Sequence, residues 1–227
     1  MPERFRSFDD AWRWFEAGGA IVDAATSRDD LTAGRAQLIA FIIPVDDQAI
    51  IDLAHDVQDA LAGLDGIEPQ PDELLHITLR LVGFQVIAKR NADEVLPREV
   101  DAIAAAVAAA LRGVAPFDAR VGPPGAFPDA LVLEVHDDGA LASLRSRVEG
   151  AASLPGDPSP YLPHITIGAF RDASAAEALR ARLGELRRAA SPLPMRVRRV
   201  ELVRAWFTGL DAEPPELDVV RSYALRG

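Results

Sequence analysis

The chain has 227 residues, and its 49% hydrophobic content supplies enough apolar sequence for a sizeable buried core. It contains no cysteine, which excludes disulfide bonds, cysteine-based zinc sites and a thiol nucleophile. The formal net charge of −11 argues against a protein that coats long nucleic acids, and we find neither a membrane span nor a signal peptide, so we expect a cytoplasmic protein.

The N-terminal segment, residues 1–35, is predicted to form a helical extension. Phe8, Trp12 and Phe15 recur at helical spacing after a serine that can cap a helix. This aromatic stripe predicts a helix packed on the core, and a lid over a ligand is the alternative. Residues 26–34 are polar and are predicted to form a loop.

Residues 36–225 are predicted to form one bilobal domain that arose by internal duplication. Strands are expected at 37–45, 74–84, 116–121, 130–135, 162–170, 195–207 and 217–225, and helices at 46–61, 97–111, 139–150 and 174–190. The elements divide into two halves of approximate β-α-β-α-β order, at about 36–121 and 126–225. A proline-rich loop at 155–160 precedes the histidine strand of the second half.

Each half contains one copy of a short motif whose side chains could take part in catalysis. The two copies are His76-Ile77-Thr78-Leu79 and His164-Ile165-Thr166-Ile167. In a strand the histidine and the threonine point to one face, and the isoleucine between them points into the core. The chain has only four histidines and five threonines, so two matched pairs are a specific signal. Two imidazoles on facing strands indicate an acid and a base.

On these motifs the chain resembles the two-histidine phosphoesterases, and among them the 2'-5' RNA ligase-like and cyclic phosphodiesterase branch. The resemblance also rests on the flanking residues 75–83, on Pro163 and on the Ala-Phe-Pro run at 126–128, and it covers about residues 36–225. It implies an α+β fold of two pseudo-symmetric lobes. Their antiparallel sheets would face a central cleft that holds both histidines, with helices outside.

The resemblance further implies a phosphodiesterase that opens 2',3'-cyclic phosphates of nucleotides or short RNA ends, as in RNA processing. His76 and His164 would act as general base and general acid, and which histidine takes which role stays open. The hydroxyls of Thr78 and Thr166 would bind the non-bridging phosphate oxygens. Run backwards, the same chemistry would ligate 2'-5' RNA. We expect no metal, no cofactor and no membrane partner, and we expect a monomer.

Four further residues are candidates for substrate binding. If its strand is regular, Arg80 shares the face of the first motif, where it could bind phosphate; a position at the sheet rim is the alternative. Tyr161, Phe84 and Phe170 could stack on a nucleobase, although phenylalanines in strands more often pack in the core. The position that corresponds to Arg80 in the second motif is Gly168, which has no side chain to offer.

Two other classes of function remain alternatives. A metal hydrolase is not favoured, because the sequence has no H-x-H or H-E-x-x-H motif. A non-catalytic module that binds a nucleotide or a phosphorylated ligand on the same fold is the stronger alternative. The two intact His–Thr pairs favour turnover, because a binder needs no proton-transfer groups. His55 and His136 lack the threonine and are predicted to be ordinary surface or capping residues.

Overall fold

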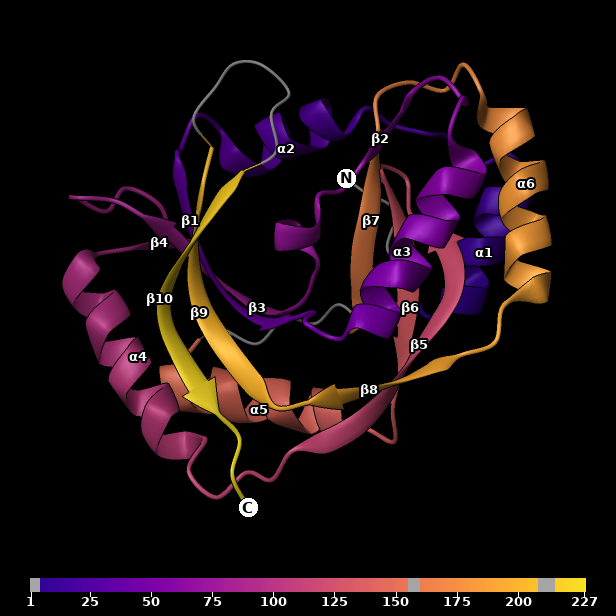
Figure 1. The fold of residues 1–227 in the computed structure, drawn as a ribbon. Helices are drawn as coiled ribbons and strands as arrows, with labels where there is room; N and C mark the ends of the chain where they lie inside the picture. The colour runs from indigo at the N-terminus through magenta and orange to yellow at the C-terminus, as the bar shows by residue number, and fades with distance from the viewer. Residues whose placement is uncertain (1–4, 155–159, 208–214) are drawn as a thin grey trace.

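One curled sheet runs through the computed structural model, which describes residues 5–154, 160–207 and 215–227 (Figure 1). Of the proline-rich loop predicted at 155–160, only Pro160 is among the described residues. No helix in these ranges is both long and apolar enough to cross a membrane.

The sheet has ten strands, and six α-helices accompany it in the described residues. The strands are β1 (Gln37–Pro44), β2 (Ile67–Pro69), β3 (His76–Gln85), β4 (Glu94–Val95), β5 (Phe117–Ala126), β6 (Ala130–His136), β7 (His164–Phe170), β8 (Leu193–Val197), β9 (Arg199–Trp206) and β10 (Glu216–Ala224). The α-helices are α1 (Phe8–Glu16), α2 (Ala24–Thr32), α3 (Gln48–Leu61), α4 (Pro97–Ala110), α5 (Ala140–Ala152) and α6 (Ala176–Ala189), and a short 3-10 helix, η1, spans Asp72–Leu74.

The two strands that carry the histidine motifs lie in the middle of the sheet. The strand order is β10-β9-β1-β3-β7-β6-β5-β8, with β4 paired to β3 and β2 paired to β7. Between β3 and β7 the structure has a single pair, Ile77 with Ile165. This narrow junction divides the sheet into two lobes: lobe 1 with β10, β9, β1, β3 and β4, and lobe 2 with β7, β6, β5, β8 and β2.

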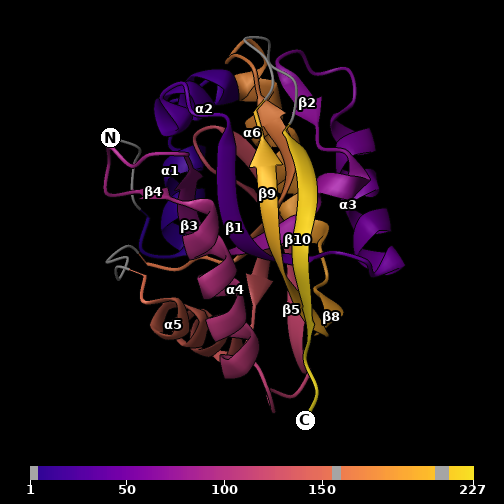
Figure 2. The ribbon, with the colours of Figure 1, turned by 90° about the vertical axis from the view of Figure 1, so that its left-hand side faces the viewer.

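Each lobe contains elements from both halves of the sequence. The late strand β9 pairs with β1 in lobe 1, and the early strand β5 pairs with β6 in lobe 2. The helices exchange in the same way, since α3 packs on β7, β8 and α6, whereas α5 packs on β3 and α4. Figure 2 shows α4 and α5 beside the strands of lobe 1. The predicted fold, two pseudo-symmetric lobes of antiparallel sheet with helices outside, is confirmed.

Local sequence signals explain where the helices begin. The Ser7 hydroxyl accepts a hydrogen bond from the Asp10 backbone at 3.1 Å and caps α1. The Asp47 carboxylate caps α3 in the same way, through the Ala49 backbone at 3.1 Å. In α4, Pro97 occupies the first turn, where a missing N–H costs no helical hydrogen bond.

The N-terminal extension, residues 5–35, which we call the leader, connects the two lobes. Phe15 of α1 is fully buried in the main core, so the predicted packed helix is confirmed. Arg180 of α6 donates hydrogen bonds to the carbonyls of Phe15 and Gly19, at 2.8 and 2.7 Å. The chain then forms α2, where a loop was predicted, and reaches lobe 1, where Arg35 binds Asp93 at 2.7 Å.

Candidate active site

The two motif strands meet at one pair of residues. Ile77 of β3 lies opposite Ile165 of β7, and both are fully buried in the core. The residues on either side of each isoleucine therefore point to the opposite face of the sheet. Antiparallel pairing sets each histidine beside the threonine of the other motif. We call this side of the sheet the motif face, and its four motif side chains are His76, Thr78, His164 and Thr166.

Each imidazole is held by an equivalent contact with the backbone carbonyl two residues before it. Nδ1 of His76 lies 2.7 Å from the Leu74 carbonyl, and Nδ1 of His164 lies 2.7 Å from the Leu162 carbonyl. A carbonyl only accepts, so each Nδ1 carries a proton and donates it. In the neutral ring this leaves the Nε2 lone pair free to accept a proton, which is the form that a general base requires.

Burial changes the acid–base behaviour of both rings. It lowers the pKa of His76 and of His164, because a buried imidazolium loses its hydration. The hydrogen bonds to Leu74 and Leu162 oppose this effect, and the charge of His164 lowers the pKa of His76 further. The two imidazoles therefore lie close enough for the charge of His164 to affect the pKa of His76.

Each motif strand contains a β-bulge directly after its threonine. In the β1–β3 pairing, Ile42 lies opposite Thr78 but the preceding residue, Phe41, lies opposite Arg80, so β3 has one extra residue. The β6–β7 pairing skips one residue of β7 just after Thr166. A bulge reverses the alternation of the side chains that follow it. In both strands, the residue four positions after the histidine therefore lies on the face opposite to the histidine.

Comparison with known proteins places this arrangement in a family. A family model described as the 2'-5' RNA ligase superfamily matches residues 45–205. The chain belongs to this superfamily. The superfamily model thus covers both motif strands and begins after the leader. A comparison with curated proteins found no match.

Several solved structures have the same fold as this chain. TT0787 of Thermus thermophilus is 22% identical, covers 84% of this chain and 98% of its own length, and has a TM-score of 0.60. LigT of E. coli without ligand is 17% identical, with coverage of 86% and 100% and a TM-score of 0.60. A structure described as a phosphoesterase is 18% identical, with coverage of 84% and 99% and a TM-score of 0.58.

Arg80 does not lie on the motif face. Its cross-strand partner Phe41 is buried in the main core, and the Arg80 guanidinium forms an ion pair with Glu149 of α5 at 3.0 Å. The prediction assumed a regular strand and is wrong because the bulge shifts the alternation by one residue. The residue that returns to the motif face is Leu81, opposite Ala40, which offers no charge to a phosphate.

Phe84 and Phe170 are core residues. Phe170 is fully buried in the main core. Phe84 is 2% exposed, packs with Leu38 and Ala205, and has the Arg35 guanidinium 3.8 Å from the centre of its ring. Neither ring presents a face to a ligand, so the prediction that they stack on a nucleobase is wrong.

Tyr161, in the loop before the second motif, forms a hydrogen bond with the first motif strand. Its hydroxyl donates a hydrogen bond to the Thr78 carbonyl at 3.2 Å, and the Arg145 guanidinium lies 4.7 Å from its ring centre. Burial raises the pKa of the Tyr161 hydroxyl, so it stays protonated and can keep this bond. Tyr161 is half-buried. A contact between its ring and a substrate remains a prediction.

Phe127 contacts the second motif histidine, a contact that the sequence did not predict. Its ring meets the His164 ring edge to face, with 4.9 Å between centroids and an interplanar angle of 82°. The available signal was the Ala-Phe-Pro run at 126–128, which the family resemblance already used. The contact places an apolar surface directly against the second motif histidine.

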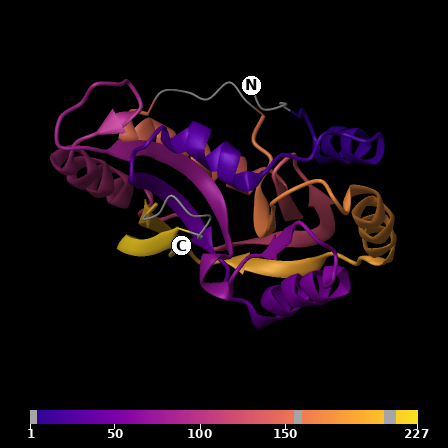
Figure 3. The same ribbon diagram turned by 90° about the horizontal axis from the view of Figure 1, so that it is seen from above.

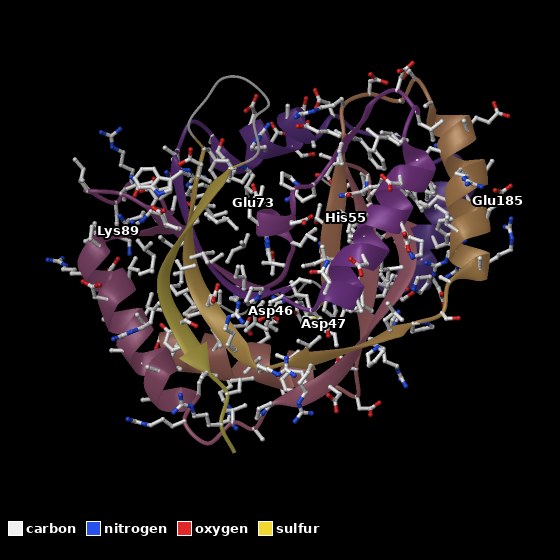
Figure 4. All side chains as sticks on the ribbon, in the orientation of Figure 1. Asp46, Asp47, His55, Glu73, Lys89 and Glu185 are labelled. Carbon is white, nitrogen blue, oxygen red and sulfur yellow. The ribbon has the colours of Figure 1, made fainter. Side chains whose placement is uncertain are left out.

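The other two histidines lie outside β3 and β7. His55 lies on α3 (Figure 4), where its ring is 2.6 Å from an Asp72 oxygen. His136 ends β6 and contacts the Glu134 carboxylate at 3.0 Å. In the part of the chain that the structure describes, no three His, Asp or Glu side chains gather closely enough to hold a metal ion.

Proposed function

We propose that this superfamily member is a metal-independent phosphodiesterase that opens 2',3'-cyclic phosphates of nucleotides or short RNA ends. The observation that carries the proposal is the set of two matched His–Thr pairs on one face of the sheet, with both imidazoles held by the same backbone contact. Membership in the 2'-5' RNA ligase superfamily supports a phosphoesterase. The reverse reaction would join 2'-5' RNA ends.

The proposed reaction needs only the four motif side chains. One neutral imidazole takes a proton from water through Nε2 while the water oxygen attacks the phosphorus. The bond from phosphorus to one ribose oxygen breaks, and the other, protonated imidazole donates its proton to that oxygen. The threonine hydroxyls donate to the non-bridging oxygens and stabilise the charge that grows there. By family analogy the product is a 2'-phosphate, and one histidine ends protonated and the other neutral.

The ligands of a structural neighbour support this class of substrate. Crystal structures of E. coli LigT contain NADP+, ATP, 3'-AMP and phosphate. All four ligands carry a phosphoryl group, and three of them carry an adenine nucleotide. The net charge of −11 gives no attraction to long nucleic acids and therefore fits a small nucleotide or a short RNA end.

A direct assay tests the proposal. The full chain is incubated with each of the four 2',3'-cyclic mononucleotides, with and without EDTA, and ring opening is followed by phosphorus NMR. We expect conversion of at least one nucleotide to a phosphomonoester at a rate that EDTA does not change. Absence of turnover on every substrate would refute the proposed phosphodiesterase activity. Tight binding without product would identify a non-catalytic binding module.

The pH dependence of wild-type activity follows from the lowered histidine pKa values. The active form has one neutral and one protonated imidazole, and burial lowers both pKa values below the ordinary 6.5. This form is then most populated on the acid side of 6.5, so we expect a bell-shaped profile of kcat/KM with its optimum there. An optimum above neutral pH would contradict this assignment.

A further inference from the structure

Helix α1 of the leader covers part of the motif face in lobe 2. Glu134 of β6 lies opposite His164, and Val132 lies opposite Thr166, so both side chains point to the motif face. Phe8 and Trp12 of α1 lie over Val132 and Glu134, which are 1% and 3% exposed. Figure 3 shows the strands of lobe 2 between α3 on one side and the indigo α1 on the other.

The leader also reaches His164 through stacked aromatic rings. Phe127, whose ring contacts His164, is stacked against Phe5 at 6.0 Å and against Phe8 at 6.4 Å between centroids. The interplanar angles are 10° and 19°, so these rings lie nearly parallel. We call Phe5, Phe8 and Phe127 the aromatic wall. Through Phe127, this wall lies directly beside the His164 ring.

The wall is fixed to lobe 2 by several contacts. The Arg187 guanidinium lies 4.8 Å from the centre of the Trp12 ring and also binds Glu134 at 2.5 Å. The Val22 backbone donates a hydrogen bond to the Pro128 carbonyl at 2.7 Å, directly after the Ala-Phe-Pro run. With Phe15 buried in the core, α1 cannot swing away without exposing apolar surface.

We propose that the aromatic wall is a specificity-determining element that limits the size of the substrate. This inference rests on the proposed function, and it extends that function, since two of the three rings belong to the leader, before the part that the superfamily model matches at 45–205. The wall occupies space next to His164 that a flanking nucleotide would need. The enzyme therefore opens cyclic mononucleotides faster than RNA ends with further nucleotides attached.

Two leader variants test the wall. Phe8→Ala removes a ring from α1, and Phe5→Ala removes a ring that precedes the helix, so the second variant does not depend on helix stability. We measure kcat/KM for a 2',3'-cyclic mononucleotide and for a trinucleotide that ends in the same cyclic nucleotide. Removal of either ring is expected to raise the ratio of trinucleotide to mononucleotide activity by about 10-fold, the usual effect of space opened in an apolar pocket.

Arg13→Ala is the matched control, because the Arg13 side chain is 72% exposed on the same helix, and it should leave the ratio unchanged. Circular dichroism and thermal unfolding show that each variant is folded. If folded Phe5→Ala and Phe8→Ala keep the wild-type ratio within about twofold, or lose both activities equally, the wall does not select size. A wild-type protein that opens neither substrate would refute the proposed function itself, and this inference with it.

Discussion

Replacing either motif histidine with alanine is expected to slow ring opening of a 2',3'-cyclic phosphate by at least about 100-fold. His76→Ala and His164→Ala each remove one proton-transfer group and leave the fold's core unchanged, because both side chains project from the face opposite Ile77 and Ile165. The loss should appear in kcat, since proton transfer accelerates the chemical step and not the binding of substrate.

The surface histidine provides the control for this loss. His55→Ala changes the same residue type on α3, where the side chain is 46% exposed and pairs with Asp72, and it should retain wild-type kcat. If either motif variant turned over every cyclic substrate at the wild-type rate, the catalytic assignment of that histidine would be wrong.

Removing a motif hydroxyl is expected to lower kcat by about 100-fold, the usual cost of losing one donor to a developing charge. Thr78→Val and Thr166→Val keep the β-branched shape that suits a strand, so the sheet should be preserved. KM should change much less than kcat, because the hydroxyl acts most strongly on the oxygens as their charge grows.

Thr26→Val tests the same substitution at an exposed position of α2 and should have no effect on kcat. Loss of substrate affinity with unchanged kcat in the motif variants would instead assign the hydroxyls to ground-state binding. Unchanged kinetics in both motif variants would remove the threonines from the mechanism.

The motif face was predictable because it depends on the period of a strand over only three residues. A histidine and a threonine two apart share a face in any regular strand, and the apolar isoleucine between them fixes which face is buried. The carbonyl contacts of Leu74 and Leu162 depend on backbone that lies before the strands, where residue type carries no such period.

The bulges explain why the prediction for Arg80 failed. The extra residues at the bulges are Leu79 and Ile167, and neither is a glycine that would have indicated a bulge in the sequence. Both residues continue the apolar pattern of their strands and are almost fully buried. The residue that returns to the motif face after the second bulge is Ala169, opposite Ala130. Neither motif strand therefore places an arginine beside the histidines.

The structure differs from the sequence-based prediction at two further places. The polar segment predicted as a loop forms α2, capped by Asp23, whose carboxylate accepts from the Ala25 backbone at 2.8 Å. The strand predicted to end at residue 121 continues to Ala126 as β5, and its pairing with β6 skips Gly122 and Pro123. The exchange of β5 and β9 between lobes involves partners distant in sequence, which local patterns do not encode.

The pH profiles of the two single-histidine variants test the central claim that His76 and His164 serve as one base and one acid. In the wild type, kcat/KM should fall on both sides of its optimum. His76→Ala and His164→Ala should each lose one limb of this bell, and they should lose opposite limbs. If both variants kept the complete wild-type bell, or lost the same limb, the two imidazoles would not form an acid–base pair.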